Sequence, residues 1–212
     1  MKSEKTRVDF RLYLITDRRL FSDDHSLFTA IEEALKGGVK AVQLREKDLA
    51  TRSLLSMAYS LRELTSAYRA KLFINDRVDI AMAVEADGVH LGGESMPAFA
   101  ARKAAGKAML IGVSAHSIGE AKKAEEEGAD FITLGPIFET PSKIKYGPPL
   151  GPGLLRETRE KISIPVFAIG GIKKERVGSV LESGASGMAL ISAILGSEDI
   201  RSNTEEFMRL LK

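Results

Sequence analysis

The sequence predicts a single (β/α)8 barrel, or TIM barrel, over residues 1–212. Short apolar runs rich in β-branched residues alternate eight times with longer amphipathic stretches, which is the pattern of parallel strands joined by crossover helices. No linker interrupts the alternation, and 212 residues lie near the lower end of the size range of closed eight-stranded barrels. Because the connections are short, we favour a closed barrel over an open doubly wound sheet.

Each expected strand is a short segment between turn signals. The first spans residues 12–16, and the helix after it, at about 27–36, should end at the double glycine Gly37-Gly38. The other strands are expected at 41–45, 71–76, 88–92, 110–114, 131–135, 165–169 and 187–191. Helices are expected at about 51–68, in a short segment that ends at 84, at 118–127 and after each of the last two strands. The connection at 137–153 is longer and rich in proline, and a loop of that length in a compact domain is usually functional, often a lid.

The composition excludes several classes of partner and site. Lys and Arg number 31 against 29 for Asp and Glu, so the charge gives no electrostatic basis for binding nucleic acid or a membrane surface. The absence of cysteine excludes disulfides, thiolate metal sites and a cysteine nucleophile. Residues 1–9 are charged, and no apolar run approaches the roughly 18 residues of a membrane span. We expect a cytoplasmic protein that acts on small molecules.

Polar residues end the second expected strand, where barrel enzymes hold their active sites. Gln43 and Arg45 share strand parity, so both side chains can point into the barrel, and Lys47 follows in the loop. An amide and two cations at one mouth suit a di- or triphosphate-like anion. The alternative for Lys47 and its neighbour Glu46 is that both are solvated loop charges.

The third and fifth strands also end in groups with two readings. Asn75 and Asp76 can supply oxygen ligands for Mg²⁺, or Asp76 can cap the short helix that follows. Ser114 and His116 close the fifth strand, where His116 can act as an acid or base near neutral pH or only form a hydrogen bond at a helix start. His90, inside the fourth strand, is more typical of a satisfied core histidine.

Glycines and small residues follow the last two strands. Gly170-Gly171 comes after the seventh strand and Ile191-Ser192-Ala193 after the eighth, the place where barrels bind phosphate through backbone N–H groups and a helix N-terminus. A glycine pair also fits an ordinary turn. Its position in the barrel favours phosphate binding.

Taken together, these segments resemble the thiamine phosphate synthase and thiazole tautomerase family over nearly the whole chain. No single segment is specific, but the combination is. The segments are Val42-Gln43-Leu44-Arg45-Glu46-Lys47, Ile74-Asn75-Asp76-Arg77, Asp87-Gly88-Val89-His90-Leu91-Gly92, Gly112-Val113-Ser114-Ala115-His116, Gly135-Pro136-Ile137-Phe138, Ile169-Gly170-Gly171-Ile172 and Ile191-Ser192-Ala193-Ile194.

The resemblance implies a synthase that joins aminopyrimidine methyl pyrophosphate to thiazole phosphate, releases pyrophosphate and uses Mg²⁺. The residues that would carry these roles are Gln43, Arg45, Lys47 and Asn75 for the pyrophosphate; Asp76 for Mg²⁺; Ser114 for the pyrimidine; Thr140, Ser142 and Lys143 for closing over the phosphates; and Gly171, Ile191 and Ser192 for the thiazole phosphate. The catalytic group expected from this set is Arg45, Lys47, Ser114 and Lys143, with His116 added.

One departure from the family pattern affects the metal. Synthases of this family usually follow the fourth strand with Gly-Gln-x-Asp, whose aspartate is the second Mg²⁺ ligand, whereas this chain has Gly92-Gly93-Glu94-Ser95. Ser95 is a poor substitute for a carboxylate, and Glu94 is offset by one residue. The expected metal site therefore rests on Asp76.

The tautomerase branch of the family is the alternative activity. It moves a proton to aromatise thiazole phosphate carboxylate, needs no metal, and would use His116 as the acid or base. We favour the synthase because Gln43, Arg45, Lys47 and Asp76, the equipment for pyrophosphate, are all present.

Two further readings belong to other classes. A non-catalytic barrel would bind thiazole phosphate without turnover, and a phosphosugar isomerase or tryptophan-pathway barrel would lack the Gln-x-Arg-x-Lys strand. Small barrels of this type often associate through their outer helices, so a homo-oligomer is among the expected states.

Overall fold

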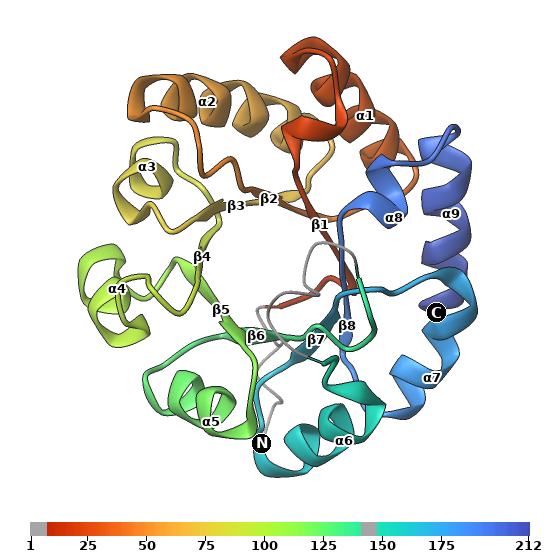
Figure 1. Ribbon diagram of the computed structural model, residues 1–212. Coiled ribbons are helices and arrows are strands. Elements are labelled where there is room, and N and C mark those ends of the chain that lie inside the picture. Colours follow the sequence, from red (N-terminus) through yellow and green to blue (C-terminus); the bar gives the residue numbers. More distant parts are fainter. Residues whose placement is uncertain (1–7, 141–147) are drawn as a thin grey trace, which may run out of the picture.

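Eight parallel strands close into a barrel in the order of the chain, with the helices outside them (Figure 1). The computed structural model describes residues 8–140 and 148–212. Each strand pairs with the next, and β8 pairs with β1 to complete the ring. The predicted (β/α)8 architecture is therefore confirmed.

The strands are short and buried along almost their whole length. They are β1 (Leu12–Ile15), β2 (Ala41–Leu44), β3 (Lys71–Asn75), β4 (Gly88–Leu91), β5 (Leu110–Ala115), β6 (Phe131–Leu134), β7 (Val166–Ile169) and β8 (Gly187–Leu190). Several are one residue shorter at one end than predicted.

The helices run antiparallel to the strands they follow. They are α1 (Asp24–Lys36), α2 (Thr51–Ala67), α3 (Val78–Ala83), α4 (Ala98–Ala105), α5 (Ile118–Glu126), α6 (Gly151–Lys161), α7 (Val177–Glu182), α8 (Ser192–Leu195) and α9 (Ile200–Leu210), with 3-10 turns η1 (Arg18–Leu20) and η3 (Lys174–Arg176). Within the described ranges, no helix combines the length and the apolarity that a membrane crossing requires.

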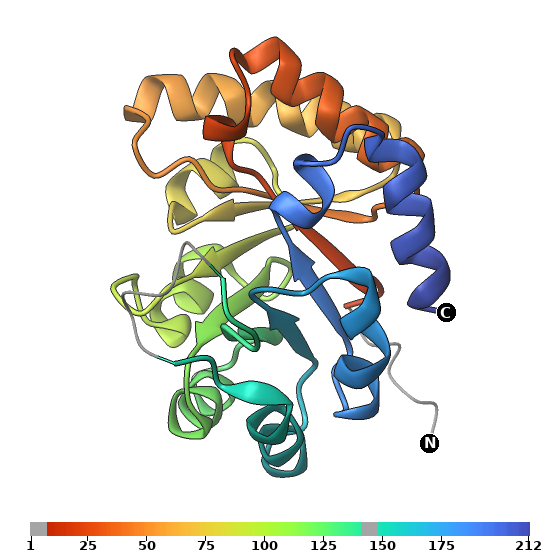
Figure 2. The ribbon, with the colours of Figure 1, turned by 45° about the vertical axis from the view of Figure 1, so that its right-hand side comes forward.

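The start and end of α1 show how local chemistry sets helix bounds. The helix begins three residues before the predicted position because Asp23 caps it, accepting a hydrogen bond from the Ser26 N–H at 2.7 Å. It ends at Gly37, where an added Cβ would lie 2.6 Å from the Thr204 Cβ on α9. The glycine lets α9 pack closely on α1, as Figures 1 and 2 show.

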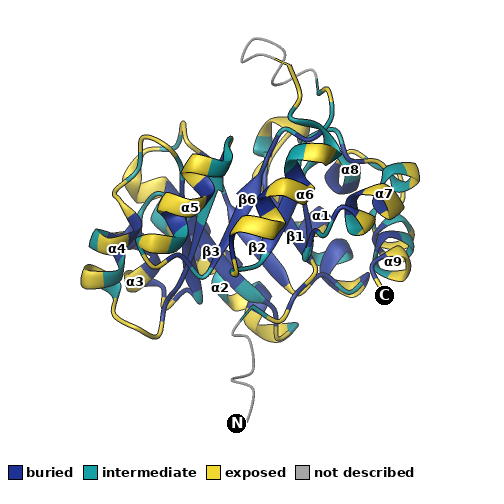
Figure 3. Ribbon diagram, turned by 90° about the horizontal axis from the view of Figure 1, so that it is seen from below, coloured by how far each residue is buried: buried dark blue, intermediate teal, exposed yellow. Residues whose placement is uncertain are grey.

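An aromatic plug fills the N-terminal half of the barrel interior. Its rings belong to Phe10, Tyr13, Phe73, Phe131 and Phe167, and their centroids lie 5.1 to 6.4 Å apart. Most pairs meet edge to face, the arrangement that aromatic quadrupoles favour. The strands around the plug are buried, as Figure 3 shows. The plug fills this half of the barrel, so a ligand must bind at the other end.

Strand glycines make room for the plug. An added Cβ would lie 2.4 Å from the Phe73 ring at Gly88 and 2.4 Å from the Phe131 ring at Gly112. A side chain at either position would displace an aromatic ring, so these glycines are required by packing.

Candidate active site

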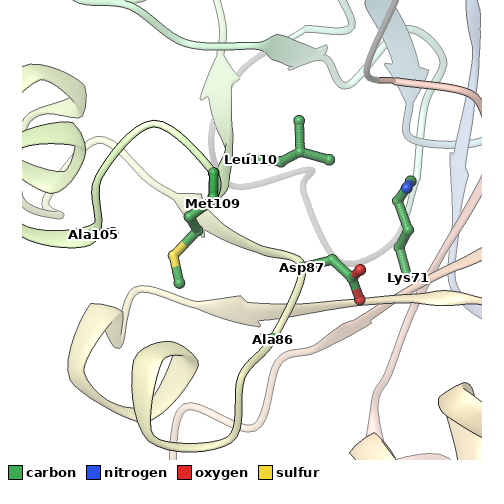
Figure 4. Close-up of a pocket in the computed structure, with 7 residues that line it drawn as sticks. Lys71, Ala86, Asp87, Ala105, Met109 and Leu110 are labelled. Carbon is green, nitrogen blue, oxygen red and sulfur yellow. The ribbon is translucent and has the colours of Figure 1, made fainter.

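A hollow of about 430 Å³ opens at the N-terminal end of the barrel, away from the strand ends where barrel enzymes react (Figure 4). Its one carboxylate, Asp87, accepts hydrogen bonds from the Leu72 N–H at 2.8 Å and from Arg62 at 2.6 Å. Asp87 therefore stabilises the fold through these two hydrogen bonds. The hollow is lined by Lys71, Ala86, Asp87, Ala105, Ala108, Met109 and Leu110.

The predicted polar residues gather at the opposite, C-terminal end. Arg45 follows β2 and is half-buried, and its backbone N–H donates to the Thr16 hydroxyl at 3.0 Å. Its guanidinium makes no hydrogen bond or ion pair with a described residue, although its charge reaches Asp17 and His90. A guanidinium held this way is available to bind an anion in the mouth.

Glu46 separates the two predicted cations and serves the fold. Its side chain is buried, accepts the Thr16 hydroxyl at 2.5 Å and accepts the Arg18 N–H at 3.1 Å. Burial raises the pKa of the Glu46 carboxyl despite these hydrogen bonds. The expectation of a solvated loop charge was therefore wrong for Glu46, which ties the loop after β1 to the loop after β2.

Gln43 lies deeper than the cations, at the boundary with the aromatic plug. Its side chain is buried, and its amide nitrogen donates to the Tyr13 hydroxyl at 3.0 Å. Burial raises the pKa of Tyr13 well above its usual value, so the phenol stays protonated. The amide is thereby fixed in orientation, and its contact with a pyrophosphate stays a prediction.

Asp76 is the centre of a cluster after β3 and β4. Asn75 donates to its Oδ2 at 2.7 Å, and the Lys47 ammonium lies 3.6 Å from the same oxygen. The Ser95 hydroxyl donates to Oδ1 and accepts the Gly92 N–H at 2.6 Å. The structure thus brings together Lys47, Asn75, Asp76 and Ser95, which the sequence placed on three separate segments.

The backbone at Asp76 is strained. Its φ of +63° lies in the left-handed region, which a residue with a side chain rarely adopts. The reading of Asp76 as a helix cap was wrong, because the N-cap of α3 is Arg77 and no side chain caps that helix. Freed from capping, the carboxylate faces Lys47 and Ser95.

The cluster of Lys47, Asn75, Asp76 and Ser95 contains one carboxylate that could bind a divalent cation, that of Asp76. Within the described residues, no group of three or more His, Asp or Glu side chains could hold a metal ion. Mg²⁺ is often held by one or two carboxylates together with substrate phosphates, so Asp76 with the Asn75 and Ser95 oxygens fits an ion that the substrate bridges. Burial raises the pKa of Asp76, but the hydrogen bonds from Ser95, Gly92 and Asn75 and the Lys47 charge together outweigh burial, so the pKa of the carboxyl lies below its usual value.

Ser114 lies beside a buried histidine that the sequence did not mark as functional. The Nε2 of His90 is 3.0 Å from the Ser114 hydroxyl and 3.3 Å from the Thr133 hydroxyl. Burial lowers the pKa of His90 to about 3, so the ring is neutral. The expectation of a satisfied core histidine holds for Nε2 and was wrong for Nδ1, which is buried and has no hydrogen-bond partner among residues 8–140 and 148–212.

His116 lies at the start of α5 and is exposed. Its Nδ1 is 2.5 Å from the Gly135 carbonyl oxygen, and its backbone N–H donates to Glu120 at 2.8 Å. The reading as a hydrogen-bonding residue at a helix start is therefore confirmed. A role as an acid or base stays a prediction.

The glycine pair after β7 lets two loops meet. Gly170 and Gly171 have φ of +96° and +64°, and a Cβ at Gly171 would lie 2.5 Å from the Glu139 carbonyl oxygen. The chain after β6 therefore rests on the turn after β7. Thr140 ends the described part of that chain, and the predicted site residues Ser142 and Lys143 lie outside the described residues.

The turn after β8 completes this side of the mouth. Ile191 is the N-cap of α8, and the first helical hydrogen bond runs from the Ile194 N–H to the Ile191 carbonyl at 3.0 Å. The N–H groups of Ser192 and Ala193 therefore have no partner within the helix. Because β7 and β8 are neighbours, these groups lie on the same side of the barrel as Gly171.

Comparison with known proteins identifies the family of this chain. The family model described as thiamine monophosphate synthase matches residues 12–194. The thiamine-phosphate synthase of Clostridium novyi is 47% identical over 92% of this chain and 95% of the relative, and that of Halalkalibacterium halodurans is 45% identical over 96% of each. A thiamine phosphate pyrophosphorylase structure from Pyrococcus furiosus has a TM-score of 0.87 and 42% identity, covering 95% of both chains. The chain therefore belongs to the thiamine monophosphate synthase family.

Proposed function

We propose that this chain is a transferase of thiamine biosynthesis that joins hydroxymethylpyrimidine pyrophosphate to thiazole phosphate and releases pyrophosphate. The observation that carries the proposal is the pairing of Lys47 with Asp76 at 3.6 Å, at the mouth where the Arg45 guanidinium makes no ion pair with any described residue. This arrangement suits a pyrophosphate bound directly or through a cation. The family relationship supplies the rest of the support.

The chemistry requires charge stabilisation more than a protein nucleophile. The bond between the pyrimidine methylene carbon and a pyrophosphate oxygen breaks, and the electron pair leaves with pyrophosphate. The thiazole nitrogen then forms the new bond to that carbon. Arg45 and Lys47 stabilise the negative charge on the leaving group, which is a large catalytic contribution in a preorganised site.

Asp76, with the Asn75 and Ser95 oxygens, would hold Mg²⁺, which neutralises phosphate charge when bound. Ser114 would contact the pyrimidine from the floor of the mouth. The N–H groups of Gly171, Ile191 and Ser192 would receive the thiazole phosphate, and Thr140, Ser142 and Lys143 would close over the phosphates. The substrates are small molecules, and both a cytoplasmic location and a homo-oligomeric state stay predictions.

The tautomerase alternative is favoured by one observation, the serine at position 95 in place of a carboxylate. That reaction moves a proton and has less use for the pair of Lys47 and Asp76. The presence of Lys47 and Asp76 favours the synthase.

The direct test is an assay of thiamine phosphate. Purified protein is incubated with both substrates and Mg²⁺, and the product is oxidised to its fluorescent form. We expect product that disappears with EDTA, and a variant Asp76→Asn that forms almost none. The matched control is Asp79→Asn, because Asp79 is an exposed carboxylate paired with Arg77 on α3. Folded wild-type protein that forms no product would overturn the proposal and favour the tautomerase, which the assay would then address with thiazole phosphate carboxylate.

A further inference from the structure

A buried imidazole forms part of the floor under the proposed pyrimidine site. His90 is 2% exposed and lies on β4, and its Nε2 faces the hydroxyls of Ser114 on β5 and Thr133 on β6 at 3.0 and 3.3 Å. Thr133 itself donates to Ser114 at 3.4 Å. The three side chains form one network, and Ser114 is its half-buried member nearest the mouth.

The ring has no freedom to change its partners. Its centroid lies 5.7 Å from that of Tyr13 and 5.8 Å from that of Phe131, so aromatic rings of the plug flank it. A Cβ at Gly112 would come within 2.6 Å of Nδ1, which shows how closely the β5 backbone passes. Packing therefore aims Nε2 at Ser114.

Nδ1 has no hydrogen-bond partner in the described part of the chain, and this indicates which nitrogen carries the proton. A neutral imidazole has one N–H and one lone pair. If Nδ1 carried the proton, a buried N–H would lack an acceptor while two hydroxyls faced a single lone pair on Nε2. If Nε2 carries it, every N–H and O–H in the network has an acceptor or faces the mouth, and only a lone pair is unmet. Orphaned buried donors are the rarer defect.

With the proton on Nε2, the hydrogen bonds of Ser114 follow. A serine hydroxyl has two acceptor lone pairs and one proton. His90 and Thr133 both donate to its oxygen from below, so its acceptor capacity is filled. The remaining group is its proton, which is left to the ligand.

We propose that His90 is a positioning residue: as the Nε2–H tautomer it donates to Ser114 and thereby sets the Ser114 hydroxyl to donate to an acceptor nitrogen of a heteroaromatic ring in the mouth. That the ring is the pyrimidine substrate rests on the proposed function. A buried His90 whose Nδ1 has no hydrogen-bond partner among the described residues stabilises the fold no more than an apolar side chain at this position would. The histidine is therefore better explained by a role in the site.

The tautomer is measured first, without any substrate. The chain has three histidines, so a long-range ¹H–¹⁵N correlation spectrum of the labelled protein at pH 7.5 is simple to assign by the loss of one pattern in His90→Gln. We expect a protonated Nε2 and an unprotonated Nδ1. The reverse pattern would overturn the proposal, because Ser114 would then donate downward to the ring.

A double-mutant cycle tests whether His90 acts through Ser114. The readout is the calorimetric Kd of the pyrimidine pyrophosphate, with kcat/KM beside it. We expect Ser114→Ala and His90→Leu each to weaken binding about tenfold, and His90→Leu to change it less than about twofold in the Ser114→Ala background. His90→Gln, which returns an N–H donor, should recover most of the loss. Equal losses in both backgrounds would show a merely structural role and overturn the proposal.

Inorganic pyrophosphate is the matched probe, since it lacks the ring. Its Kd should be the same in wild type and His90→Leu, and thermal unfolding reports whether each variant folds. If His90→Leu does not fold, Thr133→Val removes the other donor and the cycle is run with it, with the same criterion. A wild-type protein that forms no thiamine phosphate contradicts the proposed function, whereas the tautomer result stands or falls independently of it.

Discussion

The two sides of the barrel mouth are built by different means. On the side of β2 to β4, side chains make the site: Lys47 and Asp76 pair at 3.6 Å, and Ser95 donates to the same carboxylate. On the side of β7 and β8, the backbone makes it: Gly171 has a φ of +64°, and the N–H groups at the start of α8 have no helical partner. Substitution of charge should therefore damage the first side, and an added Cβ should damage the second.

The largest expected effect is on the side-chain half. Asp76→Asn should lower kcat/KM for thiamine phosphate formation by about 100-fold or more, because the variant would lose the carboxylate that we propose holds the cation at the leaving group. The Kd of thiazole phosphate, measured by calorimetry, should not change. A parallel loss of thiazole phosphate binding would break the division of the mouth into two sides.

Gly171→Ala should give the complementary result. The new Cβ would lie 2.5 Å from the Glu139 carbonyl oxygen on a left-handed residue, so we expect the KM for thiazole phosphate to rise about 30-fold as the turn shifts. Binding of inorganic pyrophosphate should stay within twofold of wild type by the principle that distant sites act independently. Gly178→Ala on α7 is the control, because nothing lies within 4 Å of an added Cβ there.

Ser95→Asp tests only the β2–β4 side of the mouth, where side chains form the proposed site. A second carboxylate beside Asp76 should tighten Mg²⁺ binding about tenfold, and like-charge repulsion should lower the Tm of the metal-free protein. Calorimetry with Mg²⁺ and thermal unfolding with and without the ion measure both effects. Glu94→Gln removes the neighbouring charge as a control, and a Mg²⁺ affinity that responds to Glu94 instead would show that Glu94 completes the site.

Glu46→Gln should have the smallest effect, and it should impair neither the β2–β4 side nor the β7–β8 side of the mouth. The amide can still accept from Thr16 and Arg18, so we expect the free energy of unfolding to fall by about 1 kcal/mol through the weaker hydrogen bonds. Urea denaturation measures this. A loss of pyrophosphate affinity beyond about fivefold would show that Glu46 also orients the cations on either side of it.

The sequence predicted the barrel and its polar mouth because both follow from simple periodicities. Strand parity correctly turned Gln43 into the barrel, and residue type singled out Asp76 and the glycine pair, whose roles stay predictions. Strand parity does not apply in the loop beyond β2, because the strand ends at Leu44. There the chain turns Glu46 inward to meet Thr16, a contact across 30 residues of sequence that no local pattern encodes.

Two contacts of the site depend in the same way on packing between strands. Ser95 was visible as a replaced ligand, but its hydrogen bond to Asp76 depends on the strained backbone at Asp76 and on the turn at Gly92. His90 looked like a core residue because its strand is apolar. Only the register of β4 against β5, and of β5 against β6, brings its ring to Ser114 and Thr133.

The most direct test of the central claim is the stoichiometry of the reaction. Wild-type protein with both substrates and Mg²⁺ is sampled over time for released pyrophosphate and for thiamine phosphate. We expect the two products in equal amounts, and neither when thiazole phosphate is omitted. Pyrophosphate released without thiamine phosphate, or no release from folded protein, would contradict it.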